Sequence, residues 1–263
     1  MEVNCAGRKA VVTAGASGIG KVIAETLYLN GADVCICDLD KGHLRSFAES
    51  RPDIKGFYAD VSCSSDVKHF LSESKLAMGG VDILVNNAGI AGPTKKVENI
   101  SDQEWQGTIA VDVDGQFYCV RSAVPMMRDI GRGTIVNISS TAGRLAFPLR
   151  LPYATAKRAV IGFTDTLAME LGPSGINVNA VLPGYVLNER ARVIIEQKAK
   201  ASGRSEDEIQ ALLLNNISMR TSIEEQEVAD LVLYLCSYQG RHISGQAISI
   251  DANLETYSGL DKL

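Results

Sequence analysis

Short runs of apolar and often β-branched residues alternate with longer amphipathic stretches along almost the whole chain. The runs are apolar at nearly every position, which is typical of parallel strands covered on both faces. Their spacing predicts seven strands, at residues 9–14, 32–38, 54–60, 81–87, 133–139, 176–184 and 246–251. Segments of helical length separate these strands, and this alternation favours a doubly wound parallel α/β sheet.

Two predicted helices begin with a capping box, Ser101 with Glu104 and Ser222 with Glu225. In such a box, each side chain accepts a hydrogen bond from the backbone N–H of the other residue. Residues 188–220 interrupt the alternation with a charged, helix-prone insertion after a strand. We expect this insertion to form a lid over a site, within a single domain that spans residues 1–263.

Composition and charge narrow the choice of partners. The chain has 263 residues, of which 26 are basic and 31 acidic, and its net charge is −5 without any basic tract. Neither nucleic acid nor an anionic membrane is therefore an expected partner. No apolar run approaches the roughly 20 residues of a membrane helix, and the first residues lack the apolar core of a signal peptide. We expect a cytoplasmic protein with a small-molecule substrate.

The cysteines give no sign of a metal site or a disulfide framework. The chain has six, without a C-x-x-C pair or an adjacent histidine cluster. Such scattered positions are typical of buried thiols, so we expect no bound metal.

The first chemical signal is the sequence TAGASGIG at residues 13–20, which follows the first predicted strand and opens a helix. Glycines there let the backbone approach a pyrophosphate, whose charge the helix N-terminus stabilises. Asp38, at the end of the second strand, can accept hydrogen bonds from ribose hydroxyls and would repel a 2′-phosphate. Because no Arg or Lys lies in the loop or directly after Asp38, NAD is favoured over NADP. A tight turn without a ligand, with Asp38 as a helix cap or solvated strand end, is the alternative.

Tyr153 and Lys157 lie four residues apart, so they share one face of a predicted helix. A phenol, whose ordinary pKa is about 10, is a poor base at neutral pH unless nearby positive charge stabilises the phenolate. An ammonium and an oxidised nicotinamide can supply that charge, and Tyr153 could then remove or donate a proton. The alternative is an ordinary amphipathic helix with a buried tyrosine and a lysine reaching to solvent.

Six motifs occur in order along the chain: TAGASGIG, YADV at 58–61, NNAG at 86–89, NISS at 137–140, YATAK at 153–157 and PGYV at 183–186. Together they resemble the short-chain dehydrogenase/reductase family over essentially the whole chain. The resemblance implies a seven-stranded Rossmann-type sheet and a homotetramer or homodimer. It also implies hydride transfer between a nicotinamide and an alcohol or carbonyl, the chemistry of the cofactor.

The same resemblance assigns roles to individual residues. Ser140 would hydrogen-bond the substrate oxygen, Tyr153 would exchange its proton, and Lys157 would hold the nicotinamide ribose. Asp60 and Val61 would flank the adenine, Asn87 to Gly89 the riboses, and Val186 the carboxamide. The full set of implied cofactor contacts is Ser17, Gly18, Ile19, Gly20, Asp38, Leu39, Asp60, Val61, Asn87, Ala88, Gly89, Tyr153, Lys157, Pro183 and Val186.

The chain departs from the family pattern at three places. The second residue of the glycine motif is Ala14, followed by Gly15, which can reshape the turn. Asn188 stands where the family usually has a threonine, and it can still hydrogen-bond. Asp112 stands at the position of the family's fourth catalytic residue, an asparagine that organises a relay water. An ionised Asp112 beside Lys157 would oppose the ammonium and impair activity or shift it to alkaline pH; a neutral or turned-away Asp112 would cost little.

Arg150, three residues before Tyr153, occupies a position that lines the substrate pocket in several relatives. An arginine there can bind a carboxylate, sulfonate or phosphate through two parallel hydrogen bonds, and Arg190 and Arg192 could join it. A surface or interface arginine is the alternative. Tyr185 and the segment RLAFPL at 144–149 suggest a partly apolar wall.

We therefore predict an NAD-dependent dehydrogenase or reductase of a secondary alcohol or ketone, whose substrate carries an anionic group. A 3-oxoacyl-thioester reductase is the alternative among enzymes, although Asp38 does not favour it because biosynthetic reductases usually use NADPH. An NAD-binding subunit with impaired catalysis is the alternative that Asp112 suggests.

Overall fold

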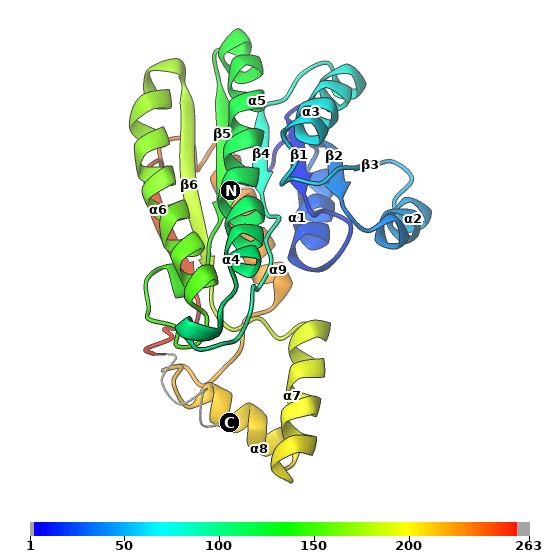
Figure 1. Ribbon diagram of the computed structural model, residues 1–263. Coiled ribbons are helices and arrows are strands. Elements are labelled where there is room, and N and C mark those ends of the chain that lie inside the picture. The colour runs from blue at the N-terminus through cyan, green and yellow to red at the C-terminus, as the bar shows by residue number, and fades with distance from the viewer. Residues whose placement is uncertain (1–2, 257–263) are drawn as a thin grey trace.

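The computed structural model describes residues 3–256, apart from the side chains at positions 190, 194, 197, 198 and 201. Its strands form one parallel sheet in the order β3-β2-β1-β4-β5-β6-β7 (Figure 1). The strands are β1 (Lys9–Thr13), β2 (Asp33–Asp38), β3 (Lys55–Tyr58), β4 (Ile83–Asn86), β5 (Gly133–Ile138), β6 (Ile176–Pro183) and β7 (Gln246–Ile250). The predicted seven-stranded doubly wound sheet is thus confirmed. The strand order reverses between β1 and β4, where such a sheet offers a crevice for a ligand.

Helices connect the strands and cover both faces of the sheet. The α-helices are α1 (Gly18–Leu29), α2 (Lys41–Ser50), α3 (Ser64–Met78), α4 (Asp102–Ile109), α5 (Gly115–Ile130), α6 (Leu151–Leu171), α7 (Glu189–Ser202), α8 (Glu206–Leu214) and α9 (Glu225–Cys236). Short 3-10 turns are η1 (Val97–Asn99), η3 (Thr141–Gly143) and η4 (Gly172–Ser174), and η2 (Ala110–Asp114) is a π-helical turn between α4 and α5.

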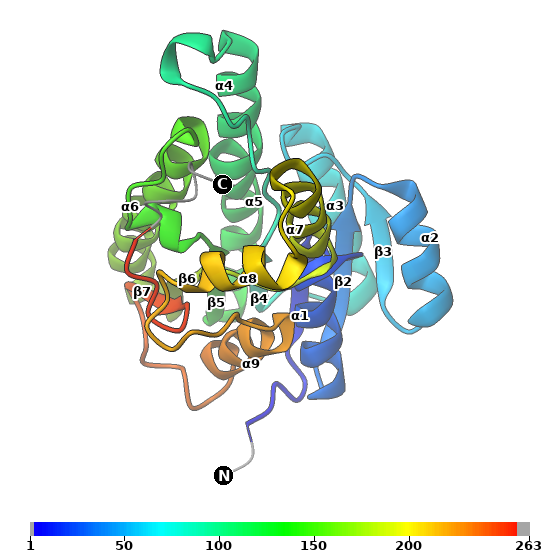
Figure 2. The same ribbon diagram turned by 90° about the horizontal axis from the view of Figure 1, so that it is seen from below.

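The core consists of two layers, one on each side of the sheet. Helices α1 and α9 pack on one face, whereas α3, α5 and α6 pack on the other (Figure 2). Along β1, Ala10 and Val12 point into the first layer and Val11 into the second, as expected from the alternation of side chains in a strand.

Helices α7 and α8 lie beyond the carboxyl ends of the strands, below the sheet in Figure 1. They pack through a small apolar cluster of Ile195, Ala199 and Ile209. Asn188 caps α7, because its side-chain oxygen accepts a hydrogen bond from Ala191 N–H at 3.0 Å. The predicted insertion at 188–220 is thus largely helical, and its first residue serves the helix itself.

One predicted capping box is confirmed and the other is wrong. Ser101 and Glu104 exchange hydrogen bonds of 2.9 and 3.2 Å at the start of α4. Ser222 does not cap α9, because that helix begins at Glu225 and the N–H of Glu224 donates to the Glu227 carboxylate at 2.7 Å. The reason is a long-range contact. Ile223 pairs with Val186 in an isolated parallel bridge, which holds the chain extended where the helix would have to start.

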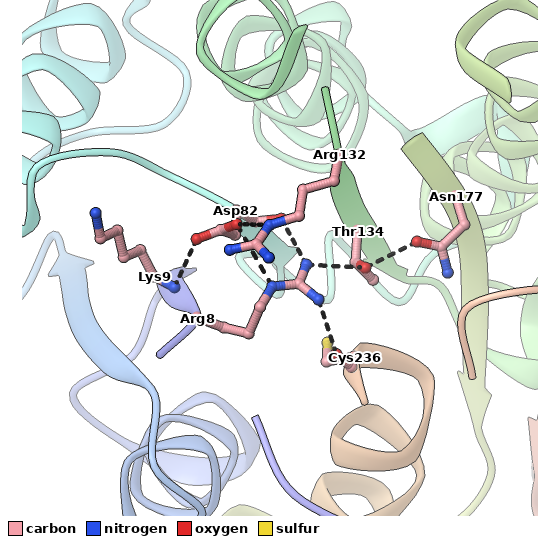
Figure 3. A network of polar contacts seen from close by, with 7 residues as sticks. All are labelled: Arg8, Lys9, Asp82, Arg132, Thr134, Asn177 and Cys236. Carbon is pink, nitrogen blue, oxygen red and sulfur yellow. Dashed lines mark hydrogen bonds and ion pairs between the residues drawn. The ribbon is translucent and has the colours of Figure 1, made fainter. Parts of the chain in front are cut away.

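At the opposite end of the sheet, a buried carboxylate ties three strands together (Figure 3). Asp82 accepts hydrogen bonds from Lys9 N–H at 3.1 Å and from Arg132 Nε at 2.8 Å. Arg8 Nε lies 3.5 Å from the same carboxylate, and its guanidinium also reaches the Cys236 carbonyl at the end of α9. This network joins the starts of β1, β4 and β5 to the helix layer.

The described residues contain no helix long and apolar enough to cross a membrane. All six cysteines are free thiols and five of them are buried, which confirms the predicted thiol environment. Within residues 3–256, no group of three or more metal-ligating side chains is found.

Candidate active site

A cavity of about 610 Å³ opens at the carboxyl ends of β4, β5 and β6. The segments after these strands, the start of α6 and the helices α7 and α8 all contribute to its wall. Of the residues selected from the sequence, the cavity wall contains Ile19, Asn87, Gly89, Ser140, Arg150, Tyr153, Lys157, Pro183, Tyr185, Val186 and Asn188. Residues that are more than a hundred positions apart therefore meet at one place.

The glycine loop leads into the N-terminus of α1 along a strained path. Ala14 has φ +49°, a left-handed conformation that glycine adopts more readily, and Gly18 has φ +54°. A side chain at Gly20 would meet the Ala14 carbonyl oxygen at 2.2 Å. Asn87 fixes the loop from the neighbouring strand, since its Nδ2 donates to the carbonyls of Thr13 and Ala14 at 3.0 and 3.2 Å. The N–H groups at the start of α1 are thus held next to β4.

Asp38 stabilises the same loop from β2. Its carboxylate accepts hydrogen bonds from Ala16 N–H at 3.2 Å and from Asp40 N–H at 3.0 Å. Asp40 caps α2, and hydrogen bonds from the N–H groups of His43 and Gly42 lower the pKa of its carboxyl group. Two carboxylates therefore lie at the end of β2, and the negative charge of Asp40 was not predicted to contribute there.

These features fit a dinucleotide. A Cβ added at Gly18 would lie in ordinary contact with Glu225 Oε1, at 3.6 Å, so a side chain from the start of α9 lies beside this loop. The N-terminus of α1 provides N–H groups, and Ser17, its N-cap, makes no side-chain hydrogen bond that would cap the helix. Leu39, which directly follows Asp38, is exposed, and Val61 is buried. Both belong to the residues that would bind the adenosine half of the cofactor. Asp60 is engaged locally, since it accepts hydrogen bonds from Ser62.

Ser140 and Tyr153 are brought together by the packing of α6 against the end of β5. The Ser139 hydroxyl donates to the Lys157 carbonyl at 2.7 Å, and a side chain at Gly143 would meet that same oxygen at 2.7 Å. This close contact between η3 and α6 places the first turn of α6 beside Ser140. The Ser140 hydroxyl oxygen accepts a hydrogen bond from Ala142 N–H at 3.1 Å, which leaves its proton available to a ligand.

Lys157 lies in the same helix, one turn after Tyr153, and forms a buried ion pair. Its Nζ lies 3.3 Å from Asp112 Oδ2 and donates to the Ile138 carbonyl at 3.2 Å. Asp112 has no solvent exposure, and its other oxygen accepts a hydrogen bond from Ile90 N–H at 2.7 Å. The π-helical turn η2 adds a residue to the helix there, a feature that often occurs at functional sites. The position of Asp112 agrees with the hypothesis of a carboxylate beside Lys157 and not with a turned-away side chain.

Arg150 precedes the first turn of α6 and contacts the tyrosine directly. Its guanidinium carbon lies 5.3 Å from the ring centroids of both Phe147 and Tyr153. It also donates a hydrogen bond to the Ala91 carbonyl at 2.6 Å. Arg150 is thus half-buried and forms part of the cavity wall.

The other predicted substrate residues differ in position. Tyr185 lines the cavity, and burial raises the pKa of its phenol while Arg192 partly opposes that effect. Arg192 is exposed on α7 and is not among the described residues of the cavity wall. The side chain of Arg190 lies outside the described residues.

Two groups of contacts were not predicted from the sequence. The Thr13 hydroxyl oxygen accepts hydrogen bonds from the N–H groups of Asn87 and Ala88, both at 3.0 Å, which couples the glycine loop to β4. Thr94 and Leu213 also line the cavity, whereas Phe147 lies in its wall as the segment RLAFPL at 144–149 predicts. Thr13 opens the glycine motif, so its position could have indicated its role, whereas Leu213 reaches the cavity only through the packing of α8.

The chain is similar to proteins that are named as dehydrogenases and reductases. A family model described as enoyl-(acyl carrier protein) reductase matches residues 13–253. A D-beta-hydroxybutyrate dehydrogenase of Rhizobium meliloti is 33% identical over 251 residues, covering 93% of this chain and 97% of its own. A 3-oxoacyl-[acyl-carrier-protein] reductase of Staphylococcus epidermidis is 29% identical, and the match covers 94% of this chain and 98% of that reductase. A crystal structure of a variant actinorhodin polyketide ketoreductase with NADPH has a TM-score of 0.89 and 29% identity, covering 95% and 98% of the two chains.

The fold and the site thus define a nicotinamide-dependent oxidoreductase of the Rossmann type. The chain belongs to the short-chain dehydrogenase/reductase family. It transfers hydride between a nicotinamide cofactor and an alcohol or ketone.

Proposed function

We propose that the protein is an NAD-dependent dehydrogenase or reductase of a small secondary alcohol or ketone that carries an anionic group. The observation that supports this most directly is one cavity of about 610 Å³ whose wall contains Ser140, Tyr153, Lys157 and Arg150. The first three supply a hydroxyl, a phenol and an ammonium, and Arg150 supplies a guanidinium at the same wall.

In the proposed reaction, Tyr153 exchanges the proton of the substrate oxygen and Ser140 donates a hydrogen bond to that oxygen. Lys157 holds the nicotinamide ribose and adds positive charge near the phenol. Bound NAD supplies the hydride acceptor, and NADH the hydride donor. The loop at Ser17 to Gly20 would hold the pyrophosphate; Asp38, Asn87 and Val186 would hold the rest of the cofactor.

The preference for NAD rests on the two carboxylates at the end of β2. Asp38 and Asp40 would both repel a 2′-phosphate, and Asp38 can accept hydrogen bonds from ribose hydroxyls. We expect NADH to bind at least 10-fold more tightly than NADPH in a fluorescence titration. Asp38→Ser should reduce this ratio, while Asp230→Ser, an exposed change on α9, should not. Equal affinity of the unaltered protein for both cofactors would contradict the preference.

The prediction that the substrate carries an anionic group rests on Arg150. A hydrogen bond between charged groups is worth about 1.5–3 kcal/mol, so Arg150→Met should lower kcat/KM for a hydroxy acid about 10- to 100-fold more than for a neutral alcohol. The relative named a D-beta-hydroxybutyrate dehydrogenase makes small 3-hydroxy acids the first substrates to test. If both substrates lose activity equally, the arginine does not bind the anionic group.

A 3-oxoacyl-thioester reductase is the second candidate, which the similarity to a reductase of that name favours. An NADPH-dependent reduction of an acetoacetyl thioester that is faster than any NAD-dependent oxidation would establish it. A cofactor-binding subunit with impaired catalysis is the third candidate, because Asp112 is paired with Lys157.

The deciding experiment is an oxidation screen with NAD over hydroxy acids, sulfonates, polyols and cyclic alcohols, followed by Tyr153→Phe on the best substrate. We expect the variant to lose at least 100-fold in kcat while its affinity for NADH stays within about twofold. A variant as fast as the unaltered protein would overturn the catalytic proposal. A screen without turnover, combined with tight NADH binding, would favour the impaired subunit.

We further propose that residues 1–263 form a single domain in which residues 188–220 act as a lid, and that the chain assembles as a homotetramer or homodimer. The contribution of Ala191 and Leu213 to the cavity wall supports the lid. Light scattering after size-exclusion chromatography tests the assembly. The cytoplasmic location stays a prediction from the sequence.

A further inference from the structure

The segment just before α6 contains a strained tight turn. Arg150 N–H donates a hydrogen bond to the Phe147 carbonyl at 3.2 Å, so residues 147–150 form a β-turn. Its third residue, Leu149, has φ +65°. The ring of Pro148, the second residue, fixes φ at about −65°, and among the common turns only type II combines that value with a positive φ at the third position. The turn is therefore of type II.

Leucine is an unusual residue at this place. The third position of a type II turn normally holds glycine, because a side chain in the left-handed region clashes with the backbone. The apolar core gives no reason for the leucine, since the described residues of both core layers and of the cluster between α7 and α8 do not include Leu149. Strain of this kind is typical of functional sites, where the side chain has a role of its own.

The strained residue lies in the wall of the active-site cavity. The Leu149 carbonyl accepts a hydrogen bond from Lys95 N–H at 2.9 Å, which joins the turn to the segment after β4. A Cβ at Gly92 would meet Thr108 Oγ1 at 2.7 Å, so this segment is itself packed closely on α4. It contributes three further residues to the wall, Ile90, Ala91 and Thr94. The wall on this side is thus mostly apolar and is fixed at both of its segments.

The cofactor and the substrate share this cavity in the proposed function. Lys157 and Val186 would contact the nicotinamide half, and Tyr153 would contact the reacting oxygen. Leu149 belongs to the part of the wall that remains for the rest of the substrate. Because an apolar wall favours an apolar ligand group, an alkyl group of the substrate is the part that fits there.

We infer that Leu149 is a specificity-determining residue, which limits the length of the alkyl group that the substrate carries on its alcohol carbon. This inference rests on the proposed function, because it needs a secondary alcohol whose oxygen lies at Ser140 and Tyr153. The turn is held by its own hydrogen bond and by the one from Lys95, so a longer alkyl group meets a wall that does not move away. The selected class is a secondary alcohol with a short alkyl group.

The test compares 3-hydroxybutyrate with 3-hydroxyhexanoate, whose alkyl group is longer by two methylenes. The methyl esters of the two acids provide a neutral pair, so the result does not depend on an anionic group. The unaltered protein should have a kcat/KM at least 10-fold higher for the shorter compound of each pair. Each methylene that finds apolar room gains about fourfold, so Leu149→Ala should raise the ratio of longer to shorter about 10- to 20-fold.

Three further variants separate the side chain from the turn. Leu149→Met keeps the volume and should keep the ratio within about twofold. Leu151→Ala makes the same truncation at an exposed leucine outside the described cavity wall and should leave the ratio unchanged. Leu149→Gly should raise the ratio as the alanine does, and it should unfold at a higher urea concentration than Leu149→Ala, because glycine adopts a positive φ without strain.

An unchanged ratio in Leu149→Ala and Leu149→Gly would overturn this inference, as would an equal rise in Leu151→Ala. So would an unaltered protein that prefers the longer compounds or oxidises none of the four. A Leu149→Gly protein less stable than Leu149→Ala would contradict the strain in the turn. The proposed function fails separately, if Tyr153→Phe retains the activity of the unaltered protein.

Discussion

Removal of the buried carboxylate at Asp82 should destabilise the protein without changing its chemistry. The carboxylate is 2% exposed and has three partners: Lys9 N–H at 3.1 Å, Arg132 Nε at 2.8 Å and Arg8 Nε at 3.5 Å. Breaking a buried ion pair by removing one partner typically costs about 3–5 kcal/mol. The side chain of Arg132 is 57% exposed and can be rehydrated. We therefore expect Asp82→Ala to lower the free energy of unfolding by about 3 kcal/mol, the lower end of this range.

The companion variants test the reasoning behind this value. In Asp82→Asn the amide oxygen still accepts a hydrogen bond from Lys9 N–H, but Arg8, whose side chain is 19% exposed, loses its counter-charge. We expect this variant to lose about 2 kcal/mol in free energy of unfolding. Arg132→Gln removes only the exposed partner and should cost less than about 1 kcal/mol.

Urea unfolding followed by far-UV circular dichroism, at one protein concentration, measures these differences. The value of kcat/KM per folded molecule should stay within twofold, because Asp82 lies at the opposite end of the sheet from the cavity. An Asp82→Asn protein as stable as the unaltered one would refute the reasoning, as would a loss of activity that exceeds the loss of folded protein.

Three other changes test single features. Ala14→Gly should stabilise the protein by about 0.5–1 kcal/mol in urea, because relief of the left-handed conformation outweighs the entropy that glycine adds to the unfolded chain; lower stability would contradict the strain. Hydrogen bonds from Lys95 and Ser101 lower the pKa of Glu104 from 4.5 to about 2, so its stabilising effect is present above about pH 4.5 and is lost as the pH falls towards 2. The difference in urea midpoint between the unaltered protein and Glu104→Gln should therefore shrink between pH 6 and pH 3; a constant difference would contradict this. Burial raises the pKa of Cys5 to about 11 and that of Cys119 to about 12, so Ellman's reagent at pH 8 should find one fast thiol, which Cys63→Ser removes.

The strands and the central catalytic set could be predicted from the sequence because both depend on strong, repeated physical signals. A strand buried on both faces needs mostly apolar residues, as in the central strands β1 and β4, whereas the edge strand β3 has the sequence KGFY and is mostly exposed. The carboxyl ends of parallel strands lie at one edge of the sheet, so Asn87, Ser140 and Val186, each just after a strand, had to be neighbours. Tyr153 and Lys157 follow from helical spacing.

The features that could not be predicted depend on contacts between distant segments. The Ser222 capping signal was locally valid, but the bridge between Ile223 and Val186 decides where α9 begins. Arg192 was assigned to the site by its place in the insertion, and the orientation of α7 leaves it exposed. The sequence pattern also placed Arg150 near the pocket, yet the contact with the Tyr153 ring depends on the conformation of the segment before α6.

Asp112 shows why a change of one atom at this position has wide consequences. Its two oxygens serve different donors, with Oδ1 bound to Ile90 N–H and Oδ2 paired with Lys157. An asparagine has one acceptor oxygen and would have to satisfy Ile90 alone, turning its own N–H donors towards the ammonium. Burial of a carboxylate is costly unless it is paired, so the ion pair with Lys157 and the hydrogen bond from Ile90 N–H together offset the burial of Asp112.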